Sequence, residues 1–218
     1  MLSQVKNTAR AVAVVVGAAY AFALHQAGFT FDNSTRTALG LAPVVVVAAI
    51  FAFDLFLWKT PLLSKYLGKP RVYGTWLVTL TPRADSHIPP GGDWGPIKGA
   101  VVIEQTFWST SVHLYTGESE SKPHAVQFVS QDGSKERQRL VYTYANTPKQ
   151  EHQGRSHPHD GAAELSVIGS KPDTMTGVYW TARLTAGDMT LKWLDKKTDY
   201  ADLAAIRAAA GKANIDWA

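Results

Sequence analysis

The chain has 218 residues, a formal net charge of +4 and a mean hydropathy of −0.11, which suits a membrane segment followed by one domain of ordinary size. It contains no cysteine, which excludes a disulfide scaffold and a cysteine-type zinc site. Beyond Trp58, 19 Lys or Arg residues stand against 16 Asp or Glu residues, a balance too even to indicate a DNA-binding protein.

The first element in chain order is an apolar run from Ala11 to Leu24, preceded by Lys6 and Arg10. Its six strongly apolar side chains favour membrane insertion by only roughly 2 to 3 kcal/mol, so this helix would depend on a neighbouring helix. A basic flank before a short apolar run also resembles a signal peptide.

The second element, Ala38 to Trp58, is long enough to cross the hydrocarbon core of a bilayer as a helix. Its twelve Leu, Ile, Phe and Val residues favour insertion by roughly 4 to 7 kcal/mol, against a cost of roughly 3 kcal/mol for Asp54. We therefore predict a transmembrane helix, with Asp54 at the level of the lipid headgroups.

Together the two apolar runs predict a transmembrane helical hairpin over residues 1–59. Lys and Arg lie at both of its outer ends, which by the positive-inside rule places both ends in the cytosol. If the first run were a signal peptide, the second would stop transfer and still leave the C-terminal domain cytosolic. Small residues spaced four apart, Gly17 with Ala21 and Ala48 with Ala52, allow close helix packing.

A basic linker over residues 60–72 leads to a region in which apolar residues alternate with a period of two. The alternation predicts eight strands: Tyr73–Leu80, Ala100–Gln105, Phe107–Thr116, Ala125–Ser130, Leu140–Tyr144, Ala162–Ile168, Gly177–Leu184 and Met189–Leu194. Residues 73–218 are therefore mainly β.

Short antiparallel strands joined by turns favour a closed up-and-down β-barrel with room for one small ligand; a sandwich is the alternative. The alanine-rich stretch Asp199 to Lys212 predicts a short C-terminal helix that packs on the barrel or plugs one end.

No catalytic motif is present, so we do not expect an enzyme, and we expect no cofactor. His152, His157, His159 and Asp160 offer metal-ligating groups. Their surroundings are typical of an exposed hairpin loop, and we predict no metal site there.

Alternation places aromatic, hydroxyl and basic side chains on common strand faces. These are Trp108, Thr110 and Thr116 on one strand, Tyr142 and Tyr144 on another, and Tyr179, Thr181 and Arg183 on a third. Aromatic rings stack on nucleobases and an arginine fork binds phosphate, so these faces indicate a nucleotide pocket. The alternative is that the aromatics fill the barrel core while Thr and Arg face water. Periodicity alone does not tell which face points inward.

Several short patterns, in order behind the two apolar runs, carry a resemblance to a known family. They are Gly74-x-Trp76, Ile103-x-Gln105 leading to Trp108, Leu114-x-Thr116-x-x-Ser119-x-Ser121, Leu140-x-Tyr142-x-Tyr144-x-Asn146-x-Pro148, His159-x-Gly161 and Gly177-x-Tyr179-Trp180-Thr181-x-Arg183. The chain resembles the two-transmembrane, β-barrel effectors of bacterial cyclic-oligonucleotide anti-phage signalling systems (CBASS).

The resemblance implies a receptor that binds a cyclic dinucleotide made by a partner nucleotidyltransferase. Its membrane segments would then form homo-oligomers and disrupt the bacterial inner membrane in abortive infection. The ligand-binding residues that it implies are Trp108, Thr116, Ser119, Ser121, Tyr142, Tyr144, Tyr179, Thr181 and Arg183.

Two other interpretations stay open at this point. Gly74-x-Trp76 with Thr181-x-Arg183 also resembles the lipocalin arrangement, in which the Arg packs over the Trp and closes one barrel end. That arrangement would imply a membrane-anchored carrier of a small apolar ligand. A plain membrane scaffold with a filled barrel is the third possibility.

Overall fold

The computed structural model describes residues 10, 14, 17–19, 22, 25–26, 33–130, 133 and 136–215. The chain divides into two compact units. The first comprises Met1–Leu63 with the short segment Thr106–Ser109, and the second comprises Ser64–Gln105 with Thr110–Ala218. Most of the apolar run predicted over Ala11 to Leu24 lies outside the described residues, so the predicted hairpin is not tested there.

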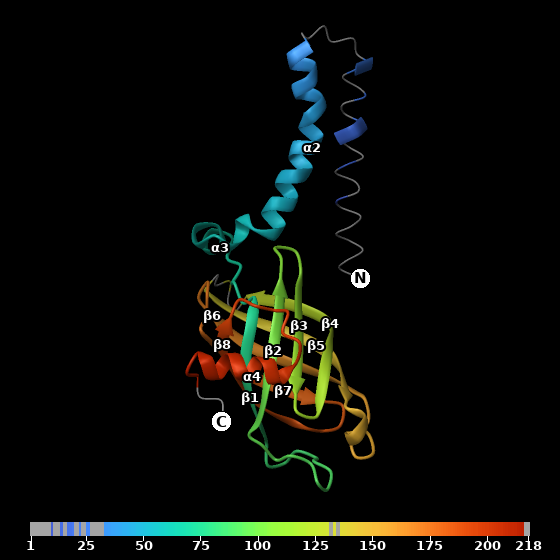
Figure 1. The fold of residues 1–218 in the computed structure, drawn as a ribbon, viewed down its shortest axis with the longest axis vertical. Helices are drawn as coiled ribbons and strands as arrows, with labels where there is room; N and C mark the ends of the chain where they lie inside the picture. Colours follow the sequence, from blue (N-terminus) through green and yellow to red (C-terminus); the bar gives the residue numbers. More distant parts are fainter. Residues whose placement is uncertain are drawn as a thin grey trace. The chain divides into compact units, whose positions relative to one another are not determined.

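The second unit is built on eight antiparallel strands that form a closed barrel in sequence order, with β8 paired to β1 (Figure 1). The strands are β1 Gly74–Pro82, β2 Ile97–Gln105, β3 Thr110–Thr116, β4 Ser119–Ser130, β5 Arg137–Pro148, β6 His159–Ile168, β7 Thr174–Thr181 and β8 Ala186–Asp195. The predicted up-and-down barrel is confirmed, and the sandwich is excluded.

All eight strands begin at other residues than predicted, and the differences at β3 and β4 have a clear cause. β3 starts at Thr110 because the preceding residues form a turn: the Thr106 amide donates to the Ser109 carbonyl at 2.8 Å, and the Ser109 amide donates to Thr106 Oγ1 at 3.0 Å. β4 starts at Ser119, before the predicted Ala125, because its polar first half pairs with β5. Pro123 is tolerated in β4 at a register shift, where the regular ladder is interrupted.

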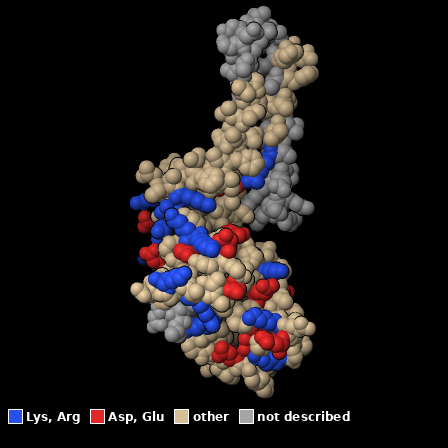
Figure 2. Space-filling view, viewed as in Figure 1, with Lys and Arg blue, Asp and Glu red and all other residues tan. Residues whose placement is uncertain are grey.

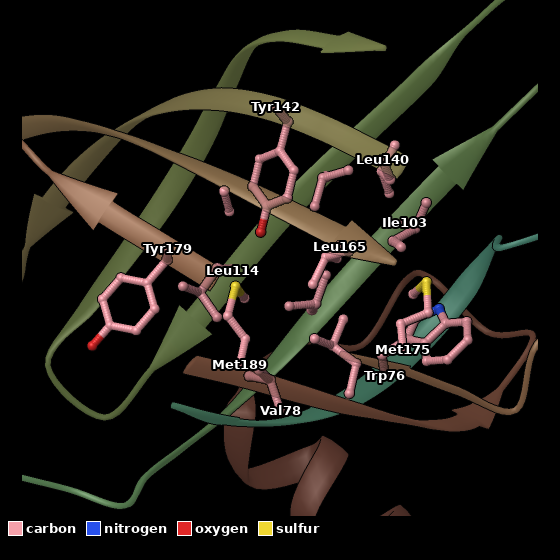
Figure 3. Close-up of a cluster of buried hydrophobic side chains, with 14 of the residues drawn as sticks. Trp76, Val78, Ile103, Leu114, Leu140, Tyr142, Leu165, Met175, Tyr179 and Met189 are labelled. Carbon is pink, nitrogen blue, oxygen red and sulfur yellow. The ribbon is translucent and has the colours of Figure 1, made fainter. Parts of the chain in front are cut away.

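The barrel interior is filled by alternate residues of its strands (Figure 3). Trp76, Leu140, Leu165, Met175 and Leu191 are fully or almost fully buried. Tyr179 lies at the opposite end of the labelled cluster from Trp76. The side chains at the Trp76 end are almost all hydrocarbon, whereas tyrosines gather toward the other end.

The first strand begins at a position that only glycine can occupy. Gly74 has a φ of +122°, and a Cβ atom there would lie 2.2 Å from the backbone oxygen of Asp195. This close approach lets β1 pair with β8 and close the barrel. The Gly74-x-Trp76 pattern therefore has a direct structural cause.

The predicted C-terminal helix is present as α4, Leu203–Lys212. It packs on the outside of the barrel, where Ile206 and Ala210 bury Leu77, Ala100 and Val102. The Asp202 carboxylate caps its first turn by accepting a hydrogen bond from the Ala205 amide at 2.7 Å. The helix does not plug a barrel end, so the interior stays available.

The predicted span Ala38–Trp58 is not present as one continuous helix. Helix α2 covers Asn33–Leu55, and the chain continues through η1, Leu57–Lys59, and α3, Pro61–Leu67. Thr60 is extended, as expected for a residue before proline. From Gly40 to Phe53 α2 carries no charged side chain (Figure 2).

In the part of the chain that the structure describes, no single helix has both the length and the apolar composition to cross a bilayer. The segments Pro43–Lys59 and Pro61–Leu67 meet these criteria only as a pair, bent by 96°. The transmembrane hairpin is therefore not supported by the fold itself.

Candidate functional site

A cavity of about 130 Å³ opens inside the barrel, toward the end where β1 and β5 finish. Its apolar floor includes Leu80, Leu114, Ala163 and Met189. Its polar and aromatic lining consists of Asp93, Thr116, Glu118, Ser119, Tyr142, Tyr144, Asn146, His152, Ser156, His159, Tyr179, Thr181, Arg183 and Thr185. An apolar floor with convergent polar groups is typical of a small-molecule site.

Two neighbouring rings on β5 form an aromatic wall of this cavity. The ring centroids of Tyr142 and Tyr144 lie 5.8 Å apart with an interplanar angle of 41°. Tyr144 lies over Gly161 of β6, where a Cβ atom would come within 2.5 Å of the ring. Burial raises the pKa of both hydroxyls, so both stay protonated hydrogen-bond donors at neutral pH.

The Tyr142 hydroxyl is buried and has no hydrogen-bond partner among the described residues. Figure 3 shows the Tyr142 hydroxyl pointing toward the middle of the labelled cluster and the Tyr179 hydroxyl pointing away from it. Burial, and to a smaller degree the Asp188 carboxylate, raises the pKa of Tyr179 to about 12. A buried donor without an acceptor is uncommon in folded proteins and indicates a place for a bound group.

Arg183 follows β7 and brings a guanidinium to the same cavity. Its Nη1 donates to Ser156 Oγ, whereas its buried Nε has no acceptor in the described structure. Burial lowers the pKa of Arg183, and the positive charge of Arg155 adds to this effect. The side chain stays charged at neutral pH. Because its Nε–H has no acceptor among the described residues, the guanidinium is suited to bind an anion.

Hydroxyls surround the aromatic wall and the arginine. Thr116 Oγ1 accepts from the Ser119 amide at 3.0 Å, which fixes the turn between β3 and β4. Thr181 Oγ1 accepts from the Thr185 amide at 3.3 Å in the turn before β8. Both residues line the cavity, where a hydroxyl group can contact phosphate or ribose oxygens.

The cavity brings together seven of the nine residues predicted to bind a ligand: Thr116, Ser119, Tyr142, Tyr144, Tyr179, Thr181 and Arg183. Ser121 does not line it, because its buried Oγ accepts the Leu114 amide at 3.1 Å between β3 and β4. The face that periodicity left undetermined is therefore the interior face for most of the set.

Trp108 is also elsewhere, in the first unit, and its placement on a strand beside Thr110 was wrong. The Trp108 amide donates to the carboxylate of Asp54 at 3.1 Å, and its ring contacts Phe53 and Phe107. Asp54 is buried and also receives the Arg10 guanidinium. This aromatic cluster packs around a charged pair and is separate from the cavity.

The lipocalin arrangement does not occur. Trp76 of β1 is paired with Trp193, and its Nε1 donates to the Val72 carbonyl at 2.8 Å. Tyr179, on the strand that Arg183 follows, is level with Gly187 and hence with Pro82 at the other end of β1. Pro82 lies six residues after Trp76 on β1, which is roughly 20 Å along the strand. Arg183 therefore does not pack over Trp76.

Sequence reasoning missed several cavity residues. Asn146 continues the Tyr142, Tyr144 alternation on β5 and could have been found by its period of two. His152 and Ser156 come from the loop between β5 and β6, where no repeating pattern predicts orientation. Among the described residues, no three His, Asp or Glu side chains come together as a metal site.

Comparison with known proteins gives two matches. Residues 69–193 match the family described as "Cap15, cyclic dinucleotide receptor domain". The chain is also similar to "CD-NTase-associated protein 15" of Staphylococcus schleiferi, with 28% identity over 142 residues, which cover 65% of this chain and 71% of that protein. The family match includes all eight strands except the last residues of β8.

Proposed function

Because this chain belongs to the family of Cap15 cyclic dinucleotide receptor domains, we propose that its barrel cavity binds a cyclic dinucleotide and that the chain acts as a CBASS effector. The ligand would be made by a partner nucleotidyltransferase, as the name of the staphylococcal relative suggests. In this proposal the protein is a receptor and not an enzyme.

The observation that carries the proposal is the pair of buried polar groups without partners in one cavity. Arg183 and Tyr142 both line the cavity, and Arg183 Nε and the Tyr142 hydroxyl are buried without acceptors among the described residues. A phosphodiester supplies acceptors for both, and a nucleobase supplies a flat surface for the wall of Tyr142 and Tyr144. A purely apolar ligand would leave both donors unpaired, which costs free energy.

We further propose that the first unit anchors the chain in the bacterial inner membrane, with the barrel in the cytosol. The uncharged stretch of α2 from Gly40 to Phe53 and the basic residues after it support this proposal. Ligand binding would shift the chain from dispersed to assembled homo-oligomers that disrupt the membrane, because a single hairpin cannot enclose a channel.

The binding experiment is isothermal titration calorimetry of the full chain in lipid nanodiscs against a panel of cyclic dinucleotides. We expect Arg183→Ala to keep its thermal transition and to lose roughly 2 to 4 kcal/mol of binding free energy, because a charge-assisted contact is lost and a phosphate is left unpaired. Arg137→Ala, which removes an exposed arginine at the start of β5, is the matched control.

A wild-type chain that binds no cyclic dinucleotide of the panel would contradict the proposal. An Arg183→Ala protein that unfolds, while any folded remainder keeps full affinity, would instead assign Arg183 a structural role.

The membrane part has its own tests. Reporter fusions at the N-terminus and after Ala218 should both report cytosol, and a fusion between Asp32 and Arg36 should report periplasm. A periplasmic C-terminus would refute the proposed topology.

Assembly is tested by crosslinking in membranes with and without ligand. Ala48 is exposed on α2, whereas a Cβ atom at Gly17 would come 2.5 Å from Pro43 Cβ of the same chain. We therefore expect Ala48→Leu to spare ligand binding and to abolish ligand-dependent oligomers and toxicity. If this variant still assembles and kills, the barrel alone drives assembly.

A further inference from the structure

A basic hollow of about 330 Å³ lies beside the cavity, and Arg183 lines both. Its other lining residues are His87 and Pro89 from the loop after β1, and Arg155, His157 and Pro158 from the loop before β6. The hollow thus has two guanidinium groups and two imidazoles in its described lining, and no carboxylate. Such a lining is complementary to an anion.

Arg155 lines the hollow but not the cavity, and it is paired with the carboxylate of Glu118, which lines the cavity. Arg155 Nη2 donates to Glu118 Oε1 at 2.6 Å, and Glu118 lines the cavity. The two side chains are 28% and 42% exposed, so water screens the pair. A screened ion pair can be exchanged for another anion at little cost.

The Glu118–Arg155 pair also fastens the loop of residues 149–158 to the turn between β3 and β4. Two further hydrogen bonds hold the start of this loop: the Lys149 amide donates to the Glu118 carbonyl at 2.8 Å, and Lys149 Nζ donates to the Gly117 carbonyl at 2.6 Å. Farther along the loop, Arg155 contacts the Glu118 carboxylate through an ion pair, and this contact depends on charge. Exchanging it would leave Arg155 Nη2 with its 3.1 Å contact to His152 Nδ1 in the same loop, while the loop stays attached at Lys149.

The small size of the cavity favours such an exchange. Pockets that enclose small ligands usually measure roughly 300 to 1,000 Å³, whereas this cavity measures about 130 Å³. A ligand that carries two phosphodiesters is therefore larger than the enclosed cavity, and a second cation would balance the charge of the phosphate that Arg183 does not contact. The adjoining hollow offers both.

We propose that the hollow is a second anion subsite, in which Arg155 exchanges the Glu118 carboxylate for a phosphodiester of the bound cyclic dinucleotide. The inference rests on the proposed function and adds two residues to it. Arg155 binds the second phosphate, and Glu118 acts as an internal competitor that occupies Arg155 when ligand is absent. The lowered pKa of Arg183, caused by burial and by the positive charge of Arg155, agrees with two cations that lack an external anion.

The test is calorimetric titration of the full chain in nanodiscs with the cyclic dinucleotide that the wild type binds best. We expect Arg155→Ala to weaken binding by about tenfold, because one charge-assisted contact is lost. Its affinity should also depend less on salt than that of the wild type. Glu118→Gln keeps the shape of the side chain and removes the competing charge, so it should tighten binding by about threefold or more.

Arg139 and Glu164 form a comparable ion pair elsewhere on the barrel, and neither lines the cavity or the hollow. Arg139→Ala and Glu164→Gln are therefore the matched controls, and both should bind like the wild type.

The outcomes separate this inference from the proposed function. If the wild type binds no cyclic dinucleotide, the proposed function fails. If the wild type binds, and Glu118→Gln has unchanged or weaker affinity while it keeps the wild-type melting temperature, the second subsite is overturned. If Arg155→Ala melts early, the Glu118→Gln titration alone decides, because that variant keeps the charge of Arg155.

Discussion

Tyr142→Phe should stabilise the ligand-free protein and weaken its binding of ligand. The Tyr142 hydroxyl is buried without a partner among the described residues, and burial raises its pKa, so it is a neutral donor with no acceptor. An unsatisfied buried polar group costs about 1 to 3 kcal/mol. Removing one oxygen also leaves a small gap, so we expect a net gain of about 1 kcal/mol.

A gain of this size corresponds to a rise in melting temperature of about 2 to 4 °C for a chain of this length. The assay is differential scanning calorimetry of the full chain in nanodiscs, without ligand. Tyr179→Phe is the matched control, because the Tyr179 side chain lines the same cavity and its hydroxyl is not among the buried groups without partners. It should change the melting temperature by less than Tyr142→Phe.

The same variant should bind a cyclic dinucleotide about tenfold more weakly, because the hydroxyl can no longer donate to the ligand. Stability and affinity would thus change in opposite directions, as is common at binding sites. A Tyr142→Phe protein that melts below the wild type would refute the reasoning, because the hydroxyl would then have a partner in the folded state.

Three further predictions follow from the placement of single side chains. Gly161→Ala should displace the Tyr144 ring, because the new Cβ would lie 2.5 Å from it; calorimetry should show weaker ligand binding with a loss of stability of about 1 kcal/mol. Trp108→Ala should leave ligand affinity within about twofold, since its amide and ring contact Asp54 and Phe53 in the first unit, whereas a loss of tenfold or more would return it to the site. Burial lowers the pKa of His159, so the unfolded chain takes up a proton first as the pH falls. Stability should therefore decrease below about pH 6.5, and unfolding titrations should show a smaller decrease for His159→Gln.

Much of the barrel is predictable because its strands alternate apolar and polar residues with little interruption. All eight strands were expected, and β5 shows why: Leu140, Tyr142 and Tyr144 point inward at a spacing of two. The first half of β4 was missed because it is polar and contains Pro123. It is a strand because β5 offers it a partner, which is a property of the tertiary fold.

The cavity could be predicted only in part, because a strand position has two possible faces and a loop position has many. Alternation placed Tyr179, Thr181 and Arg183 on one face but did not tell that this face is the interior. Trp108 lies in the apolar pattern that predicted β3. The hydrogen bonds of Thr106 and Ser109 place it in a turn instead, so β3 begins only after Trp108. Ser156 reaches Arg183 from a loop whose path depends on contacts distant in sequence.

The central claim is that the cavity around Arg183 and Tyr142 receives a cyclic dinucleotide, and an experimental structure of the full chain with the bound ligand tests it most directly. We predict a phosphodiester oxygen within about 3.2 Å of Arg183 Nε and a base packed against the wall of Tyr142 and Tyr144. A ligand bound on the outside of the barrel would contradict the claim. So would a ligand inside the barrel that leaves both Arg183 Nε and the Tyr142 hydroxyl unpaired.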